Sequence, residues 1–283
     1  MPINRSIFSD HEGNSLRLSS VLQTEEQVFF EKFSIKYVVS GKENYTVNNR
    51  KIDLNEGEYI TGNCNTTSTV LIDNPIPVRG ICVDIAEQII TEVIEHKIQN
   101  PNKFGQFILE QQWMVQKNSL KNSTLGHELI KIAAEFDNLS KVDYPVNKSF
   151  FYTLAESIIN DQVRIYQDFS KLKFVKEETN GHLFNFINDA KNYIDYNFLK
   201  EISIENIANE AKLSEYHFMR LFKTVFNKSP YQYLLEKKLE YSLLLLKDKY
   251  STAEISFMLG YNDSSAFCNA FKKHFGNTPK YYK

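Results

Sequence analysis

The spacing of apolar side chains changes once along the chain, at about residue 85. Before that point, apolar and polar residues alternate in short segments separated by turn-forming residues. Alternation with a period of two is typical of strands that bury one face. Strands are predicted at residues 33–39, 45–47, 50–54, 58–61, 68–72 and 78–84. Six or more short strands with hairpin connections indicate a small antiparallel sandwich or barrel.

Turn residues divide these strands from one another. Asn48 and Asn49 separate two alternating segments, and asparagine tolerates the positive φ angles of a tight hairpin. The Asn-Glu-Gly sequence at 55–57 turns the chain again. The Asp-Asn-Pro sequence at 73–75 is expected to break the chain between the last two strands.

After residue 85, apolar residues recur every three or four positions, as in amphipathic helices. Helices are predicted within residues 85–98, 125–139 and 150–169. The apolar stripe of the third can pack on the barrel or face a second copy of the chain, because both arrangements need the same periodicity. The polar segment 176–181 contains a glycine and is predicted to be a linker. It separates a domain at 1–175 from a purely helical domain at 182–283.

Composition narrows the class of protein. The 283 residues are 42% hydrophobic and 24% charged, as in ordinary soluble proteins. No apolar run approaches the roughly 20 residues of a membrane helix. The first residues lack the apolar core of a signal peptide, so a cytoplasmic protein is expected. Cys64, Cys82 and Cys268 form no pairing motif and are expected to be reduced thiols.

The net charge of -2 is unevenly distributed along the chain. Residues 182–283 contain 14 Lys and Arg against 11 Asp and Glu, which leaves 19 against 24 upstream. The C-terminal domain therefore has a net charge of +3 and the rest has -5, while residues 212–283 alone reach +6. A basic end on an acidic body favours a polyanion partner for that end only.

The C-terminal hundred residues nearly repeat themselves, with an offset of 48 residues that becomes 49 after a turn. The aromatic and proline positions Phe218, Phe222, Phe226, Pro230 and Tyr233 recur as Phe267, Phe271, Phe275, Pro279 and Tyr282. Each copy also has the capping residues of its two helices and of the helix that follows them. The predicted N-caps are Ser203, Ser214, Ser229, Ser251, Asp263 and Thr278, and the predicted left-handed C-terminal residues are Asn227 and Gly276. A short helix, a tight turn and a second capped helix, present twice, predict two helix-turn-helix units.

Motifs in this region resemble a known family. They are Ile-Ala-x-x-Ala-x-Leu-Ser-x-x-His-Phe-x-Arg-Leu-Phe-Lys at 207–223, Ser-Pro-x-x-Tyr-Leu at 229–234, Gly-Tyr-x-Asp-x-Ser-x-Phe at 260–267 and Phe-Lys-Lys-x-Phe-Gly-x-Thr-Pro at 271–279. Over about a hundred residues the sequence is similar to the DNA-binding domain of AraC/XylS-type bacterial transcription regulators.

The resemblance implies a mixed fold. An N-terminal antiparallel β barrel, cupin-like and followed by a helical dimerisation region, would precede a C-terminal all-α domain with two helix-turn-helix units. It also implies a sequence-specific regulator that binds double-stranded DNA, forms a homodimer and responds to a small-molecule effector in the barrel. RNA polymerase is a further candidate partner, and no cofactor is implied.

Helix geometry and the family pattern together nominate the DNA contacts. In the first unit, Phe218 and its apolar neighbours take the buried face, and His217 is expected to be a structural packing residue. The residues left to face the groove or its phosphates are Glu215, Tyr216, Met219, Arg220 and Lys223. Arg220 matches the recurrent arginine of the family, and its planar guanidinium suits guanine O6 and N7 or a phosphate.

The second unit departs from this pattern. Asn269 replaces the usual arginine, and the other candidates for base contact are the short side chains of Ser264, Ser265 and Cys268. Lys272 and Lys273 can still bind phosphates. The first unit is therefore predicted to dominate sequence specificity, and the second mainly to anchor the domain.

Other functions receive less support. The upstream histidines form no closely spaced metal-binding pair, and no nucleotide-binding or nucleophile motif is present, so an enzyme is not expected. Tyr37, Tyr45 and Tyr59 can line an effector cavity in the barrel or fill a solid core. In the second case, the regulator would be independent of small ligands and controlled by a protein partner or its own abundance. The small total charge disfavours a non-specific architectural DNA binder.

Overall fold

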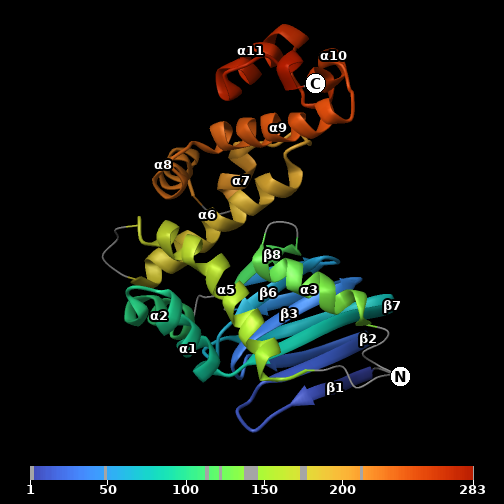
Figure 1. Ribbon diagram of the computed structural model, residues 1–283, viewed down its shortest axis with the longest axis vertical. Coiled ribbons are helices and arrows are strands. Elements are labelled where there is room, and N and C mark those ends of the chain that lie inside the picture. Colours follow the sequence, from blue (N-terminus) through green and yellow to red (C-terminus); the bar gives the residue numbers. More distant parts are fainter. Residues whose placement is uncertain are drawn as a thin grey trace. The chain divides into compact units, whose positions relative to one another are not determined.

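The computed structural model describes residues 3–47, 50–111, 115–120, 123–136, 146–172, 177–210 and 213–282. They divide into two units, Met1–Ser170 with Val175–His182, and Lys171–Phe174 with Leu183–Lys283. The first unit contains an antiparallel sheet and helices, and the second is helical (Figure 1). None of the helices in the described segments combines the length and apolar character that a bilayer-spanning helix requires.

The sheet of the first unit confirms the predicted antiparallel architecture. Its strands are β1 (Ile3–Ser9), β2 (Ser15–Phe29), β3 (Phe33–Ser40), β4 (Lys42–Val47), β5 (Arg50–Asn55), β6 (Glu58–Gly62), β7 (Thr67–Ile85) and β8 (Gln116–Ser119). The order is β1-β2-β7-β3-β6-β8, and β4 pairs with both β5 and β7. β7 therefore pairs with β4 through its first half and with β3 through its second. The folded sheet encloses an apolar cluster that includes Phe30, Val38, Leu54, Ile60 and Val78.

The predicted break at 73–75 is wrong, because β7 continues through it as one strand. Opposite β2 the pairing register jumps at this point, since Val21 pairs with Val78 and Gln23 pairs with Asp73. Residues 74–77 form a bulge that contains Pro75 and Pro77. Proline is tolerated in a bulge because its missing N–H is not needed by the ladder.

The predicted hairpin between β4 and β5 is confirmed by the pairing of Val47 with Arg50. Asn48 and Asn49, the proposed turn residues, lie outside the described residues. β1, β2 and β8 were not among the predicted strands. β8 pairs with β6 across about 60 positions of sequence, so no local pattern marks it.

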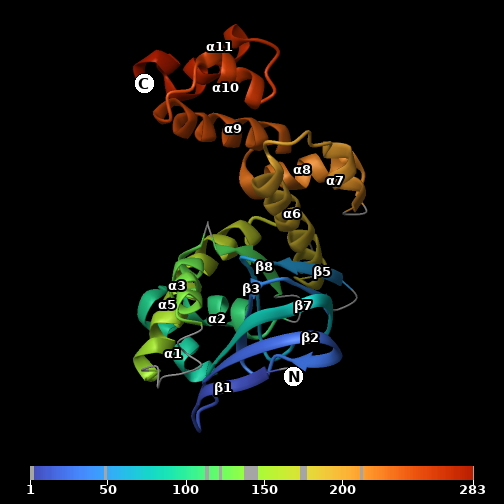
Figure 2. The same cartoon turned by 90° about the vertical axis from the view of Figure 1, so that its right-hand side faces the viewer.

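Four helices of the first unit lie together on one side of the sheet (Figures 1 and 2). They are α1 (Glu87–Lys97), α2 (Pro101–Leu109), α3 (Thr124–Ala134) and α5 (Lys148–Phe169). The predicted helix at 125–139 thus ends at Ala134 in its regular part, and residues 137–139 lie outside the described residues. The apolar stripe of α5, including Phe151, Leu154 and Ile158, is buried within this unit, as the packing alternative predicted.

The second unit contains α6 from Leu183 onward and the helices that follow it. They are α6 (Glu177–Asn197), α7 (Ile204–Glu210), α8 (Glu215–Phe226), α9 (Pro230–Lys247), α10 (Thr252–Met258), α11 (Ser264–Phe275) and the 3₁₀ helix Pro279–Tyr282. Residues 177–181 of the predicted linker are the first residues of α6, and Lys176 lies outside the described residues. A polar segment with one glycine can remain helical, because glycine costs only about 1 kcal/mol relative to alanine inside a helix.

Candidate nucleic-acid interface

In each helix-turn-helix unit, both helices begin at the N-cap residues that the sequence predicted. The N–H groups of Asn206 and His217 donate to the hydroxyls of Ser203 (3.2 Å) and Ser214 (3.3 Å). In the second unit, Ser251 forms a reciprocal capping box with Glu254, and Asp263 accepts from the N–H of Ala266 at 2.7 Å. These bonds satisfy backbone donors that would otherwise lack partners and fix where each helix starts.

The two longer helices also end alike. Asn227 after α8 has a φ of 59° and Gly276 after α11 has a φ of 81°, so both occupy the left-handed region. Each N–H donates to the carbonyl four residues back, on Lys223 and Lys272. Ser229 then caps α9 in a capping box with Gln232, and Pro230 occupies the first helical turn. The repeat seen in the sequence is therefore a repeat of local structure.

Equivalent aromatic pairs fix the buried faces of α8 and α11. Phe218 and Phe222 are fully buried with ring centroids 5.7 Å apart, and Phe267 and Phe271 are fully buried with centroids 5.6 Å apart. Edge-to-face pairs of this kind add to the stability gained by burying the rings. Because one face of each helix is anchored in a core, the opposite face is available to a partner.

The exposed face of α8 contains every residue that the sequence nominated there. These residues are Glu215, Tyr216, Met219, Arg220 and Lys223. Tyr216 has 71% of its surface exposed, and Arg220 has no ion-pair partner among the described residues. His217 is also exposed, so its prediction as a packing residue is wrong. It adjoins buried Phe218 in sequence, but successive residues of a helix point about 100° apart.

The corresponding face of α11 exposes fewer of the side chains that the sequence nominated for contact with DNA. Ser265, Asn269, Lys272 and Lys273 are exposed, whereas Ser264 and Cys268 are half-buried. Cys268 packs against the apolar cluster of the second helix-turn-helix unit, which reduces its availability to a partner. His274 comes after the two lysines in the last turn and is exposed, and the sequence pattern did not nominate it. The basic side chains of α11 thus gather at its C-terminal end.

Helix α9 lies between the two helix pairs (Figures 1 and 2) and is bonded to elements on both sides. Near its start, the Tyr233 hydroxyl donates to Asp195 of α6 at 2.8 Å, and Lys237 approaches the same carboxylate at 3.2 Å. At the middle of α9, the Lys238 ammonium donates to the carbonyl of Leu259 at the end of α10 at 2.8 Å. Desolvation by burial lowers the pKa of Lys238. Lys238 therefore bonds α9 to the second helix-turn-helix unit.

The three tyrosines nominated as effector ligands do not share one cavity. Tyr45 lies in the apolar cluster enclosed by the sheet, and its hydroxyl donates to Glu43 at 2.7 Å. Tyr37 and Tyr59 are cross-strand partners on the opposite face, since their neighbours Val38 and Ile60 belong to the enclosed cluster. The Tyr59 hydroxyl donates to Ser123 at the start of α3 at 2.7 Å.

A polar cluster inside the folded sheet was not predicted. Asp84 accepts hydrogen bonds from the hydroxyls of Ser34 (2.5 Å) and Ser15 (2.8 Å) and lies 3.9 Å from the buried Lys36 ammonium. Desolvation by burial acts to raise the pKa of Asp84, but the Lys36 charge and the Ser34 hydrogen bond hold it below its ordinary value. Strand pairing brings these residues together from distant parts of the sequence.

Comparison with known proteins identifies the same region. Residues 207–283 match a family model described as a helix-turn-helix domain. The Msm operon regulatory protein of Streptococcus mutans is 24% identical over 256 residues, which are 89% of this chain and 84% of that protein. An uncharacterized HTH-type transcriptional regulator, YdeC of Bacillus subtilis, is 34% identical over 93 residues, 32% of each chain.

Among solved structures, an AraC-type regulator from Chromobacterium violaceum has 26% identity, with a TM-score of 0.33. The match covers 34% of this chain and 88% of that chain. The relatives are named as regulators, in agreement with the expectation that the chain is not an enzyme. The YdeC match and the Chromobacterium violaceum match each cover about a third of this chain.

Proposed function

We propose that this chain, a transcription regulator with an AraC-type DNA-binding domain, recognises a specific double-stranded DNA sequence through α8 and α11. The duplicated pair of capped helices, each anchored by two buried phenylalanines and exposed on the opposite face, is the observation that supports this proposal most directly. Helix-turn-helix units place the N-terminal part of their second helix in the major groove. The chain would act in the cytoplasm, where its DNA lies, and would assemble as a homodimer that contacts RNA polymerase.

The two helices would contribute unequally. Arg220 of α8 is exposed and without an ion-pair partner among the described residues, so its guanidinium is available to guanine or phosphate. α11 has Asn269 at the equivalent position, with the lysines at 272 and 273 one turn farther along. Bidentate base contacts discriminate between sequences, whereas phosphate contacts mainly position the protein. α8 would therefore set specificity, and α11 would anchor the domain.

The length of α9 supports simultaneous binding by both helices. Its 18 residues span about 27 Å at 1.5 Å per residue. Successive major grooves on one face of DNA are about 34 Å apart. A continuous helix of this length, bonded to α6 near its start and to the end of α10 at its middle, would limit the spacing at which the two recognition helices meet the duplex.

The N-terminal unit would control this binding in one of two ways. The first is a small-molecule effector held in the N-terminal barrel, with Tyr37, Tyr45 and Tyr59 as its candidate ligands. The second is a ligand-independent regulator that answers to a protein partner or its own abundance. The hydroxyl partners of Tyr45 and Tyr59 favour the second, as does the cavity beside Tyr59, whose volume of about 10 Å³ can hold at most one water molecule.

The test of DNA recognition begins with mapping of the DNA sites that the full-length chain binds across a bacterial genome. Titrations with a mapped site and with versions altered in either half-segment then compare Arg220→Ala, Asn269→Ala and the control Arg164→Ala, which removes an exposed arginine from α5. Loss of a bidentate arginine contact costs about 1–3 kcal/mol, so Arg220→Ala should lose about 5- to 150-fold of discrimination at one half-segment. Asn269→Ala should lose less, and Arg164→Ala none.

Equal losses for Arg220→Ala and Asn269→Ala would contradict the unequal roles. Binding without any sequence preference would contradict the proposed function itself. The same titrations with chain purified free of small molecules bear on control. Binding that strengthens or weakens on addition of cell extract passed through a small-pore membrane would favour an effector, and unchanged binding the ligand-independent alternative.

A further inference from the structure

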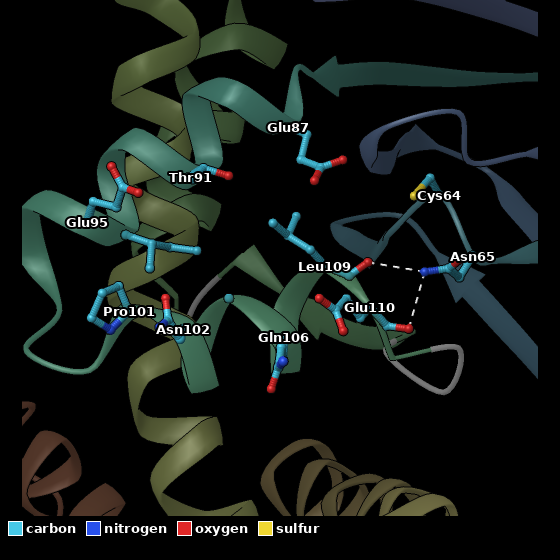
Figure 3. Close-up of a pocket in the computed structure, with 12 residues that line it drawn as sticks. Cys64, Asn65, Glu87, Thr91, Glu95, Pro101, Asn102, Gln106, Leu109 and Glu110 are labelled. Carbon is cyan, nitrogen blue, oxygen red and sulfur yellow. Dashed lines mark hydrogen bonds between the residues drawn. The ribbon is translucent and has the colours of Figure 1, made fainter.

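A cleft of about 400 Å³ lies in the first unit, outside the enclosed core of the sheet. Its walls are α1, α2 and the turn after β6 (Figure 3). The volume falls within the range of small-molecule sites, about 300–1,000 Å³. Nothing in the proposed recognition of DNA uses this cleft.

The turn that forms one wall is fixed to the end of α2 by two asparagines. The Asn63 side-chain amide donates to the carbonyls of Ile108 and Gln111, each at 3.0 Å. The Asn65 amide donates to the carbonyls of Leu109 and Glu110, each at 3.2 Å (Figure 3). These bonds occupy carbonyls that the helix end leaves without partners. The wall is therefore in place before any ligand arrives.

Gly105 lines the cleft from the middle of α2. Glycine inside a helix costs about 1 kcal/mol relative to alanine, so a glycine there calls for a structural reason. Close packing is not the reason, because a Cβ built at Gly105 would have no atom within 4 Å. The missing side chain instead leaves open space beside the apolar side chains of Ile94 and Leu109, which also line the cleft.

The polar lining is acidic. Glu87, Glu95 and Glu110 line the cleft, and all three are exposed and without an ion-pair partner among the described residues (Figure 3). Asn102, Gln106 and Thr91 add neutral hydrogen-bonding groups. No lysine or arginine is among the described residues that line it. Three carboxylates around a partly apolar cleft attract a cation that has a hydrocarbon body, and they repel anions.

We propose that this cleft binds a small organic cation, an aliphatic amine whose ammonium groups pair with the lining carboxylates while its methylene groups cover Ile94 and Leu109 beside Gly105. The primary charge partners are Glu87 and Glu95 of α1. Charge-assisted hydrogen bonds from ammonium to carboxylate are about twice as strong as neutral ones, and they orient the amine. This site is independent of the DNA-binding role and is tested without DNA.

The test is isothermal titration of the full-length chain with putrescine and with the longer spermidine. 1,4-Butanediol, which has the length of putrescine without its charges, is the matched neutral ligand. Putrescine or spermidine should bind saturably and butanediol should not. Glu87→Gln with Glu95→Gln should weaken binding at least tenfold, and Gly105→Leu should abolish it by filling the open space.

Glu25→Gln, which removes an exposed carboxylate from β2, is the control for loss of charge alone and should leave amine binding unchanged. Leucine is a better helix former than glycine, so Gly105→Leu should retain the melting temperature of the parent chain. Absence of saturable binding by both amines would overturn the proposal. Equal binding of butanediol, or amine binding that the cleft variants leave intact, would overturn it as well.

Discussion

Two buried carboxylates inside the folded sheet should affect stability in opposite directions. Asp84 is paired with Lys36, which is only 3% exposed, and also accepts from Arg17 and two serine hydroxyls. Glu43 is buried as well, and desolvation raises its pKa although the Tyr45 hydrogen bond and the Lys36 charge act to lower it. The proposed perturbations are Asp84→Asn and Glu43→Gln, which remove each charge and nearly preserve shape.

The expected magnitudes depend on what each substitution leaves behind. Asp84→Asn leaves the buried Lys36 ammonium without its nearest carboxylate, and breaking a buried pair in this way costs about 3–5 kcal/mol. For a unit of this size, that cost lowers the melting temperature by about 6–20 °C. Glu43→Gln keeps an acceptor for the Tyr45 hydroxyl and removes a desolvated charge, so its effect should stay within about 1 kcal/mol or be stabilising.

The pH dependence separates the two further. The folded-state pKa of Asp84 is lowered, so its contribution is complete above the unfolded pKa of about 3.9 and is lost as pH falls through the folded value. The folded-state pKa of Glu43 is raised, so its contribution is complete at low pH and is lost as pH rises through the folded value. Each variant should therefore differ most from the parent near neutral pH and approach it in acid.

The assay is chemical denaturation of the full-length chain at several pH values from 8 down to about 2, monitored by tryptophan fluorescence. Trp113 is the single tryptophan of the sequence and falls within the range of the first unit, so the signal reports on that unit. Equal destabilisation by Asp84→Asn and Glu43→Gln at neutral pH would refute the reasoning. So would a loss in Asp84→Asn that stays constant down to pH values at which Asp84 is protonated.

The remaining predictions concern the capped helices of the second unit, and circular dichroism at the helical band measures them. Ser251→Ala removes the hydroxyl half of a capping box and should cost about 1 kcal/mol; an unchanged unfolding midpoint would show that solvent replaces the cap. Asn227→Gly should stabilise by a few tenths to about 1 kcal/mol because φ is 59°, whereas Gly276→Ala, at a φ of 81°, should destabilise by about 1 kcal/mol or more. The same sign for both substitutions would contradict this account.

Short-range features of the structure could be predicted from the sequence. Caps at Ser214 and Asp263 involve groups three residues apart, so the residue types alone identify them. The repeat and the buried faces of α8 and α11 are evident from apolar spacing. Features that depend on long-range pairing could not be predicted. The bulge that accommodates Pro75 and Pro77, strand β8 and the cluster around Asp84 all form between segments far apart in sequence.

The sequence predicted which face of α8 is exposed more reliably than it predicted the position of each individual residue. Exposure of Tyr216 and Arg220 is a consequence of the burial of Phe218 and Phe222. The assignment of His217 to the interior failed because family frequency, and not helix geometry, suggested it. Tyr37, Tyr45 and Tyr59 all face buried surroundings, but strand alternation divides them between two faces of the sheet. Their sequence spacing could not show this without the register of the strands.

Because α9 is uninterrupted, its number of residues sets how the two helix-turn-helix units are oriented relative to each other. Adding or deleting one residue in its exposed stretch would shift the second helix-turn-helix unit by only about 1.5 Å but would rotate it by about 100° about the helix axis. Such a change leaves each half able to fold and leaves its chemistry intact. It nonetheless turns one of them away from the duplex, so the connector's length should resist change even where its surface side chains do not.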